Sequence, residues 1–396
     1  MVINMCEYNN VPKIRFKGFT DVWEQRKASD LALFSKGNGY SKGDLVNEGT
    51  PIILYGRLYT KYQSMISDVD TFVVPQSGSV YSQGNEVIIP ASGETAEDIA
   101  RASAVEKSGI LLGGDLNVLR PFNFINAFFL ALSISNGKPQ KELAKKAQGK
   151  SVVHIHNSDI QEVFITYPLR VEQDKICKLF TNLDNLITLH QRKCDTLVNV
   201  KKSLLEKMFP KNPSNIPEIR FKEFTDVWEQ RKAKELCSIT TGKSNTQDQV
   251  QDGKYPFYIR SDVPVRSNRY LYDEEAVITI GDGNIGRVFH YVNGKFDLHQ
   301  RCYKMADFKA LTAKYFYYYF STKFYERAMS MTAKATVDSV RLEMISDMEI
   351  KFPKDTTEQT IISELLTNLD NLITLHQRKL EKLKNIKKSM LERMFV

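Results

Sequence analysis

Two long stretches of the chain distribute apolar residues with the period of an α-helix. Residues 172–209 and 358–395 contain neither Pro nor Gly, and each would be about 57 Å long as one continuous helix. Apolar residues recur at spacings of three and four, as at the contact positions of a coiled coil. The two predicted seams are Ile176, Leu179, Leu183, Leu186, Leu197, Val200 and Leu204, and Ile362, Leu365, Leu369, Leu372, Leu383, Ile386 and Met390.

Polar residues interrupt both seams near their middle. His190 and Lys193 stand in the first seam, and His376 and Lys379 stand at the matching place in the second. Polar residues at such positions usually fix the register of a helix pair or mark a hydrated break. Two long helices with one apolar stripe each are most simply buried against each other. Because a globular region lies between them, we expect an antiparallel pair.

The regions before each long helix have the pattern of short strands. Residues 29–171 and 234–357 contain β-rich apolar runs separated by Gly, Asn and Asp. Each region has an apolar strand leading into a polar Gly loop, EVIIPASGE from Glu86 and EAVITIGDG from Glu275. Each then has an Asp-Leu pair, at 115–116 and 297–298, and an aromatic helical stretch, at 126–134 and 314–322. Each closes on a similar apolar ladder, Val152, Ile160, Ile165 and Pro168 or Val337, Ile345, Ile350 and Pro353. This order predicts one α/β (α+β) fold used twice.

The chain also contains an internal repeat. PKIRFKGFTDVWEQRKA at 12–28 returns with two differences at 217–233, and LFTNLDNLITLHQRK at 179–193 returns with one difference at 365–379. The regions between the repeats differ clearly in sequence, so something preserves the repeats while the separators vary. The predicted organisation is an N-terminal segment (1–28), a first variable domain (29–171), a first long helix (172–209), a linker with the second motif copy (210–233), a second variable domain (234–357) and a second long helix (358–396).

Composition adds weak constraints. The chain has 55 Lys and Arg against 47 Asp and Glu, a formal charge of +8, which favours an anionic partner. The variable domains hold little of this excess, with 13 basic and 14 acidic residues in 29–171 and 18 and 16 in 234–357. The five cysteines form no CxxC pair, and no apolar run approaches the roughly 18 residues of a membrane span. We therefore expect a cytoplasmic protein that does not bind a membrane.

No catalytic constellation is present in the sequence. GDGNIG at 281–286 satisfies the GxGxxG pattern, but the following RVFHYVNGKF predicts a strand and an Asn-Gly hairpin turn, whereas a dinucleotide site needs a helix. TGKS at 241–244 lacks the first Gly of a phosphate loop, since Cys237 stands there. The six histidines have no metal-ligand spacing, and His154 and His156 alternate on a predicted strand as surface or core residues. The sequence predicts no catalytic residue and no metal site.

The repeated motifs carry a resemblance to a known family. FTDVWEQRKA before each variable region and TNLDNLITLHQRK after each one resemble a type I restriction-modification specificity subunit, over nearly the whole chain after residue 12. The resemblance implies two target-recognition domains that each read half of a split site in double-stranded DNA, spaced by an antiparallel coiled coil. It also implies a non-catalytic chain that binds two copies of a modification subunit, which restriction subunits join. S-adenosylmethionine, ATP and Mg²⁺ are then expected in the partner subunits, and no cofactor in this chain.

Under this resemblance, local loops of the variable domains must contact the DNA, because neither domain is strongly basic. Arg is suited to guanine, Asn and Gln to adenine, and a carboxylate to cytosine, although phosphate contacts or solvated loop charges are the commoner use of such residues. The candidates are Arg57, Tyr59, Lys61, Tyr62, Ser92, Glu94 and Thr95 in the first domain, and Arg260, Arg266, Arg269, Asp282, Asn284, His299, Gln300 and Arg301 in the second.

The long helices supply the candidates for binding the partner subunit. Their polar face is identical in both copies, as expected of a surface that docks the same partner twice, although recent gene conversion would give the same identity. These residues are Thr181, Asn182, Asp184, Asn185, Thr188, Gln191 and Arg192, with Thr367, Asn368, Asp370, Asn371, Thr374, Gln377 and Arg378. Two other classes stay open: a scaffold or adaptor without DNA sequence preference, and an autonomous nuclease or methyltransferase.

Overall fold

The computed structural model of the chain describes residues 11–147, 149, 152–332 and 339–395. The chain folds as two compact units: unit 1 comprises Met1–Leu189 and Lys379–Val396, and unit 2 comprises His190–Arg378. Each unit therefore contains one β-rich region and one half of each long helix. Across the described part of the chain, no helix combines the length and apolar character that a membrane span requires.

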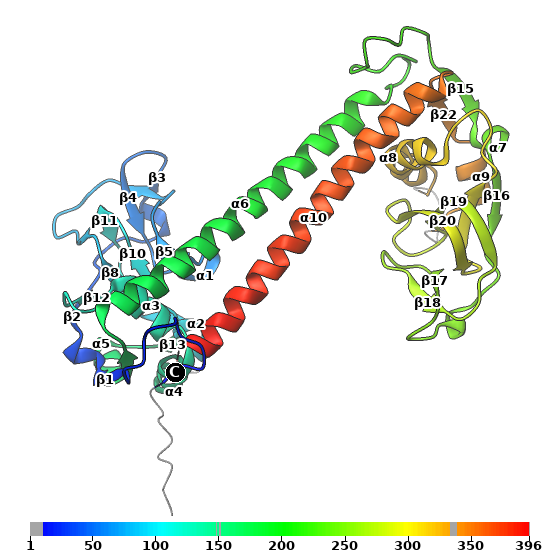
Figure 1. The fold of residues 1–396 in the computed structure, drawn as a ribbon. Coiled ribbons are helices and arrows are strands. Elements are labelled where there is room, and N and C mark those ends of the chain that lie inside the picture. Colours follow the sequence, from blue (N-terminus) through cyan, green and yellow to red (C-terminus); the bar gives the residue numbers. More distant parts are fainter. Residues whose placement is uncertain (1–10, 148, 150–151, 333–338, 396) are drawn as a thin grey trace, which may run out of the picture. The chain divides into compact units, whose positions relative to one another are not determined.

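The two predicted long helices are confirmed as α6 (Arg170–Met208) and α10 (Thr356–Met394), each 39 residues long (Figure 1). They pair antiparallel within each unit. In unit 1, Lys387 Nζ lies 2.5 Å from Asp184 Oδ1, and in unit 2, Lys201 Nζ lies 2.5 Å from Asp370 Oδ1. Both partners of the second ion pair lie 186 positions from those of the first. The helix pair therefore repeats the same contact under the internal symmetry of the sequence.

The predicted seam is wrong at its centre and at Val200. Leu186, Leu372 and Val200 are 43%, 44% and 43% exposed, whereas Cys194, Ile373 and Leu380 are buried. After Leu183, the side of α6 that faces α10 continues through Ile187, four residues on, and His190, three residues further on. The predicted seam continued instead through Leu186, three residues after Leu183. Spacings of three and four are both compatible with 3.6 residues per turn, so the apolar pattern alone does not choose between them.

The predicted polar break in the seam is present. The Nδ1 atoms of His190 and His376 lie 2.8 Å apart within unit 2, at a hydrogen-bonding distance. Lys193 and Lys379 are instead exposed. The polar layer is therefore a histidine pair, and the two lysines point to solvent.

Unit 1 contains mixed β-sheets with short helices. Its elements are β1 (Glu24–Lys27), β2 (Ala32–Lys36), β3 (Leu45–Val46), β4 (Thr50–Ile53), α1 (Arg57–Thr60), β5 (Met65–Ile66), β6 (Phe72–Val73), β7 (Tyr81–Gln83), β8 (Glu86–Pro90), β9 (Ser92–Gly93), α2 (Ala96–Ile99), β10 (Ser103–Val105), β11 (Ser108–Leu112), β12 (Leu116–Pro121), α3 (Ala127–Ile134), α4 (Gly137–Lys146), β13 (Val153–His154), α5 (Asn157–Gln161) and β14 (Phe164–Tyr167). The main sheets have the orders β2-β12-β8-β10-β5 and β3-β6-β4-β11-β7, and two smaller pairings join β1 to β14 and β9 to β13.

Unit 2 has a single larger sheet with the order β16-β21-β19-β20-β17-β18, and a smaller pairing of β15 with β22. Its elements are β15 (Glu229–Lys232), α7 (Ala233–Leu236), β16 (Ser238–Thr241), β17 (Tyr255–Tyr258), β18 (Val265–Ser267), β19 (Tyr272–Ile280), β20 (Phe289–Leu298), β21 (Cys302–Ala306), α8 (Ala313–Thr332), α9 (Leu342–Ser346) and β22 (Glu349–Phe352). The order β2-β12-β8-β10 of unit 1 matches β16-β21-β19-β20 here.

Equivalent backbone hydrogen bonds confirm that both units use one fold. Asn38 N–H donates to Leu112 O, and Lys243 N–H donates to Leu298 O; Gly113 N–H donates to Ile53 O, and His299 N–H to Tyr258 O. Asn38 and Ile53 lie 205 positions before their counterparts Lys243 and Tyr258, and Leu112 and Gly113 lie 186 positions before Leu298 and His299. The same two shifts relate the sequence repeats. The divergent domains therefore keep one backbone frame.

This frame corrects two details of the sequence analysis. Ala91 N–H donates to Asp115 O and Gly281 N–H donates to Arg301 O, so Asp115 corresponds to Arg301 and the two Asp-Leu pairs are not equivalent. The predicted hairpin turn at Asn293-Gly294 is also wrong, because both residues lie inside β20 and pair with Glu275 and Glu274 of β19. Gly294 takes φ +119° within the strand, so a long β19–β20 ladder accommodates the dipeptide that usually forms a turn.

The cores form where helices cover these sheets. In unit 1, α3 is wholly buried, and Phe129 of α3 packs on Phe395 at the end of α10. In unit 2, Tyr315 of α8 packs edge-on against Phe209 at the end of α6. The aromatic run at 314–322 is therefore core. In the closing ladder Ile160, Ile165, Ile345 and Ile350 are fully buried, Val152 is exposed and Val337 lies outside the described residues.

Candidate nucleic-acid interface

Four of the predicted DNA-binding residues of unit 2 meet at one edge of its sheet. Asp282 Oδ2 accepts from Arg301 Nη1 at 2.7 Å, and Arg260 Nη1 lies 3.2 Å from both carboxylate oxygens. His299 lies in the same turn as Arg301, and its Nδ1 accepts from the Arg301 backbone N–H at 3.1 Å. Arg260 follows β17 and Asp282 follows β19, whereas His299 and Arg301 lie in the turn between β20 and β21. The end of β17 runs parallel to the end of β20, and the start of β21 pairs with the end of β19. The sequence placed them in three separate loops, and the sheet brings those loops together.

Arg269 belongs to an adjoining polar cluster. Its Nη2 donates to Ser244 Oγ at 2.9 Å and to Asp248 Oδ2 at 2.6 Å, and its Nε lies 3.5 Å from Asp297 Oδ2. Asp297 is fully buried and also accepts from Ser244 Oγ at 2.5 Å. A backbone bridge between Ser244 and His299 connects this cluster to the first one. Arg269 therefore stabilises a buried carboxylate and keeps a half-exposed guanidinium beside the DNA-binding candidates.

The charges of the cluster shift its ionisation. Burial alone would raise the pKa of Asp282, but hydrogen bonds from Arg301 and Arg260 outweigh it and lower that pKa. Burial, followed by the positive charge of Arg260, lowers the pKa of His299. At neutral pH the cluster therefore holds an ionised Asp282 and a neutral His299, which can accept from the Arg301 backbone.

The remaining candidates of unit 2 lie apart from this centre. The guanidinium of Arg266 donates to Gly253 O and Lys254 O, both at 2.9 Å, across the β17–β18 hairpin. Asn284 is exposed on the same loop as Asp282, and Gln300 is exposed in the turn before Arg301. Arg266 thus has a structural role visible in its contacts, whereas Asn284 and Gln300 flank the cluster.

In unit 1 the basic candidates are engaged by an acidic loop. The Arg57 side chain is only 9% exposed and donates to Asp70 Oδ1 at 2.5 Å, while Lys61 Nζ lies 2.5 Å from Asp70 Oδ2. Hydrogen bonds from Lys61 and Arg57 lower the pKa of Asp70 to about 2. Arg57 is therefore mainly structural, and Lys61 is the more exposed cation of the pair.

The aromatic candidates of unit 1 surround an arginine that the sequence reasoning missed. Arg101 lies over the rings of Tyr59 and Tyr62, at 5.5 and 5.4 Å from their centroids. Tyr59 OH donates to Ser92 O at 2.6 Å, and Ser92 Oγ lies 3.1 Å from His154 Nδ1. The structure thus joins α1 to the Gly loop of this unit. Arg101 follows α2 in a segment without any motif, so no sequence signal identified it.

The last candidates of unit 1 lie on the same Gly loop. Thr95 Oγ1 accepts from Asp98 N–H at 3.0 Å and caps α2, and Glu94 is exposed beside it. Ser92 occupies the position equivalent to Asp282, because each follows by one residue the loop position that bonds to the Asp115 or Arg301 carbonyl. Ser92 and Asp282 therefore lie at one equivalent place in the shared fold.

The identical helix faces are only partly free. Asn182, Asn185, Thr188, Gln191 and Arg192 are exposed, as are their counterparts on α10. Thr181 and Thr367 are half-buried. The expectation that Asp184 and Asp370 lie on the solvent face is corrected, because Lys387 and Lys201 of the facing helix hold them. Contacts between the two helices therefore account for the identity of Asp184 and Asp370 in both copies, but not for the identity of the exposed residues.

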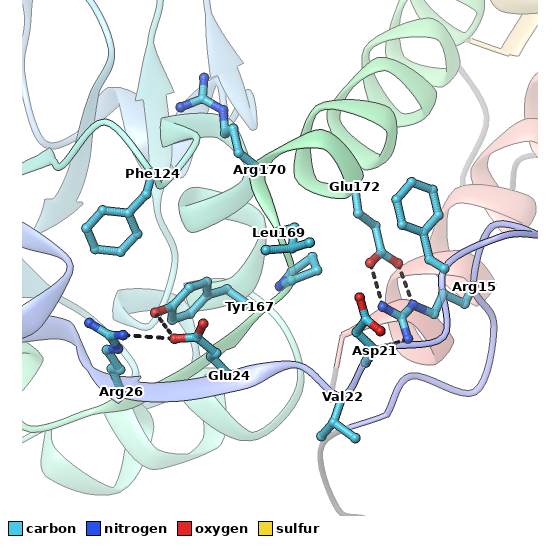
Figure 2. Close-up of a pocket in the computed structure, with 12 residues that line it drawn as sticks. Arg15, Asp21, Val22, Glu24, Arg26, Phe124, Tyr167, Leu169, Arg170 and Glu172 are labelled. Atoms are coloured by element: carbon cyan, nitrogen blue, oxygen red, sulfur yellow. Dashed lines mark hydrogen bonds and ion pairs between the residues drawn. The ribbon is translucent and has the colours of Figure 1, made fainter.

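A cavity of about 400 Å³ lies beside the start of α6 in unit 1 (Figure 2). Its walls contain the ion pair of Arg15 with Glu172 and the hydrogen bond from Tyr167 OH to Glu24. Arg15 and Arg26 contact the wall carboxylates of Glu172 and Glu24, whereas Arg170 donates to Asp174 and to Asn123 O outside the wall. The cavity therefore marks the junction of the repeated motif with α6, away from the DNA-binding candidates.

Three of the described thiols are poor nucleophiles. Burial raises the pKa of Cys177, Cys237 and Cys302 to about 12, so these groups are protonated near neutral pH. No group of three or more His, Cys, Asp or Glu side chains in the described ranges is arranged to hold a metal ion.

Comparison with known proteins follows the internal repeat. The family model of the type I restriction modification DNA specificity domain matches residues 20–199 and again residues 225–385. The chain belongs to this family. Each match spans one variable region of the specificity-domain chain and part of the long helix that follows it, and the resemblance carried by the repeated motifs is confirmed.

Relatives and solved structures agree. The chain is 21% identical over 352 residues to the specificity subunit of the type I restriction enzyme MjaVIII of Methanocaldococcus jannaschii, covering 81% of this chain and 80% of that protein. It is 26% identical over 161 residues to the EcoDI specificity subunit of Escherichia coli, covering 41% of this chain and 35% of that protein. The crystal structure of a type I restriction-modification S subunit from M. genitalium covers 98% of this chain and 99% of its own, with 14% identity and a TM-score of 0.70. That likeness shows a shared fold.

Proposed function

We propose that this chain is the DNA-recognition subunit of a type I restriction-modification complex, in which each unit reads one half of a bipartite, asymmetric target. The observation that carries the proposal is that both units share one backbone frame but differ in the side chains of the loops where the DNA-binding candidates lie. Equivalent positions pair Ser92 with Asp282, and Gly113, Gly114 and Asp115 with His299, Gln300 and Arg301. Different hydrogen-bonding groups on one scaffold are what recognition of two different base sequences requires.

Domain replacement tests this proposal. Replacing 29–171 by the corresponding region of another specificity subunit should change one half of the methylated motif in cells, and replacing 234–357 should change only the other half. Each chimera is the control for the other. A continuous palindromic motif, or a change of both halves by one replacement, would contradict the proposed architecture.

The chain is proposed to recognise DNA without catalysing a reaction. The family match and the missing catalytic motifs support this assignment over a scaffold and over an autonomous enzyme. S-adenosylmethionine would then be held by modification subunits, and ATP and Mg²⁺ by restriction subunits. Purified chain supplied with S-adenosylmethionine and target DNA should transfer no methyl group until a modification subunit is added. Methyl transfer by the chain alone would refute this part.

The long helices are proposed to dock two modification subunits on their identical exposed faces. Arg192→Glu should weaken one docking event and Arg378→Glu the other, because each reverses an exposed charge on one copy of the face. Lys382→Glu is the matched control, since Lys382 is exposed but its counterpart on α6 is Thr196. Native mass spectrometry of the assembled complex should show two bound copies for the wild type and control, and one for each Arg variant. A single copy on the wild type would contradict the proposal.

A further inference from the structure

The Asp282 cluster has a geometry that distinguishes base contact from phosphate contact. Asp282 is 17% exposed, whereas the side chains of Arg260 and Arg301 are 46% and 63% exposed. Each guanidinium approaches the carboxylate through Nη1. Among the described residues, neither guanidinium has another hydrogen-bond acceptor. The Nε and Nη2 donors of Arg301, which form a parallel pair, therefore stay available for a ligand.

The backbone around Arg301 is fixed by the sheet. Gly281 N–H donates to Arg301 O at 2.8 Å, Val340 N–H to Gly281 O at 2.7 Å, and His299 N–H to Tyr258 O at 2.9 Å. A Cβ atom at Gly281 would lie 2.6 Å from Arg301 O, so this close approach requires glycine. Arg301 is thus presented from a rigid edge, and Asp282 limits the rotation of its guanidinium. Fixed donors lose little conformational entropy on binding.

The carboxylate decides between two uses of an exposed arginine. A phosphate contact gains from positive charge alone, and a neighbouring Asp would weaken it by repelling the phosphate. A base contact needs two donors in one plane and a defined direction, which an Asp–Arg hydrogen bond supplies. Guanine presents O6 and N7 as paired acceptors in the major groove, and Arg is their commonest partner. The Asp282–Arg301 pair has less net positive charge than an arginine alone, but its donors point in a defined direction. This combination favours a base contact.

Unit 1 lacks this device at the equivalent place. Ser92 stands where unit 2 has Asp282, and Asp115 stands where unit 2 has Arg301. The same edge therefore presents a carboxylate in one unit and a guanidinium in the other. The two units should differ in the base that they prefer at this position.

We propose that Arg301, oriented by Asp282, reads a guanine in the half-site recognised by unit 2. This inference rests on the proposed function, and it adds a base identity and two residue roles to it. Arg301 is the contacting residue, and Asp282 is a positioning residue that acts through it.

The test uses the full chain with its modification subunit in cells, and the methylated motif is the measurement. The half-site of the wild-type motif that changes when residues 234–357 are replaced should contain a guanine. Arg301→Lys should reduce discrimination at that base pair by roughly 10- to 100-fold, because Lys keeps the charge but loses the paired donors. Asp282→Asn should relax the same position, and Arg301→Gln should also lose the guanine preference. Arg231→Lys, which changes an arginine of the same unit that pairs with Glu229 on β15, is the control and should leave the motif unchanged.

The outcomes separate this inference from the proposed function. If the unit 2 half-site contains no guanine, or if Arg301→Lys lowers methylation of all sites equally with an unchanged motif, Arg301 is a phosphate contact and the inference is wrong. If relaxation appears in the unit 1 half-site, the assignment of position is wrong. A wild-type motif that is not bipartite, or that does not follow domain replacement, overturns the proposed function itself.

Discussion

At the residue scale, two buried ion pairs connect the repeated motif to the long helices. Arg15 contacts Glu172 and Arg220 contacts Glu358, each through two hydrogen bonds of 2.7–2.8 Å. In both pairs the arginine is 12% and the glutamate 1% exposed. Burying a carboxylate is costly unless it is paired. Arg15 and Arg220, the equivalent arginines of the repeated motif, therefore meet the same packing requirement in both units.

Removing one arginine should destabilise only its own unit. Arg220→Ala leaves Glu358 buried without its partner, and we expect a loss of about 3–5 kcal/mol in the free energy of unfolding of unit 2. Arg15→Ala should have the same effect on unit 1. Hydrogen exchange resolved along the chain measures each unit separately, which a single melting curve does not.

The control for this prediction is Arg26→Ala, since Arg26 forms an exposed pair with Glu24. An exposed pair contributes about 0–1 kcal/mol, so protection of both units should stay nearly unchanged. Equal loss of protection in both units after Arg220→Ala would contradict the assignment of this pair to unit 2.

At the element scale, the long helices combine an apolar stripe with polar contacts at defined levels. Asp184 with Lys387 and Asp370 with Lys201 contact across the helix pair in each unit, and His190 faces His376. An all-apolar stripe would tolerate several registers, whereas paired polar groups are satisfied in one register only. The polar contacts therefore select the antiparallel register that the leucines alone leave open.

The histidine pair is expected to be coupled. His190→Leu or His376→Leu alone leaves one imidazole facing an apolar side chain, and each should destabilise unit 2 by about 1–2 kcal/mol. The double variant removes both polar groups and should be close to the wild type or more stable. Unfolding by a chemical denaturant, monitored by hydrogen exchange at residues of unit 2, gives the free energies of unfolding of the wild type and the three variants. These values define the coupling energy of the double-mutant cycle. Additive effects of the two substitutions would mean that the histidines do not interact.

At the scale of the whole molecule, the two long helices are the elements that run from one unit into the other. Their length should therefore set the number of unread base pairs between the half-sites. With one helical turn between half-site centres, that spacing is on the order of 34 Å. Each unit has its own group of DNA-binding candidates, so spacing and sequence preference should be separable properties.

Lengthening both helices should alter the spacing without altering the half-sites. Four residues inserted after Lys193 and after Lys379 would extend each helix by about 6 Å. We expect a changed gap in the methylated motif, or loss of binding where the register of the helix pair fails. An insertion in α6 alone is the control, and it should abolish methylation because the two helices no longer match. Altered half-site sequences after the paired insertion would contradict this separation.

The sequence by itself determined the long helices, the internal repeat and the assignment to the family, because periodicity and repetition are properties of the chain that need no distant contacts. Tertiary structure decided what depends on contacts between distant segments. Leu186 was expected in the helix contact and is exposed, whereas Asp184 was expected on the solvent face and contacts the facing helix. A contact stripe that steps by four residues and one that steps by three fit the same apolar pattern, so the sequence alone did not place these two residues. Asp115 was matched to the wrong aspartate because only the sheet hydrogen bonds reveal its equivalence to Arg301. Arg101 and the convergence of Arg260, Asp282 and Arg301 were decided by strand ends that meet in space, which no spacing along the chain encodes.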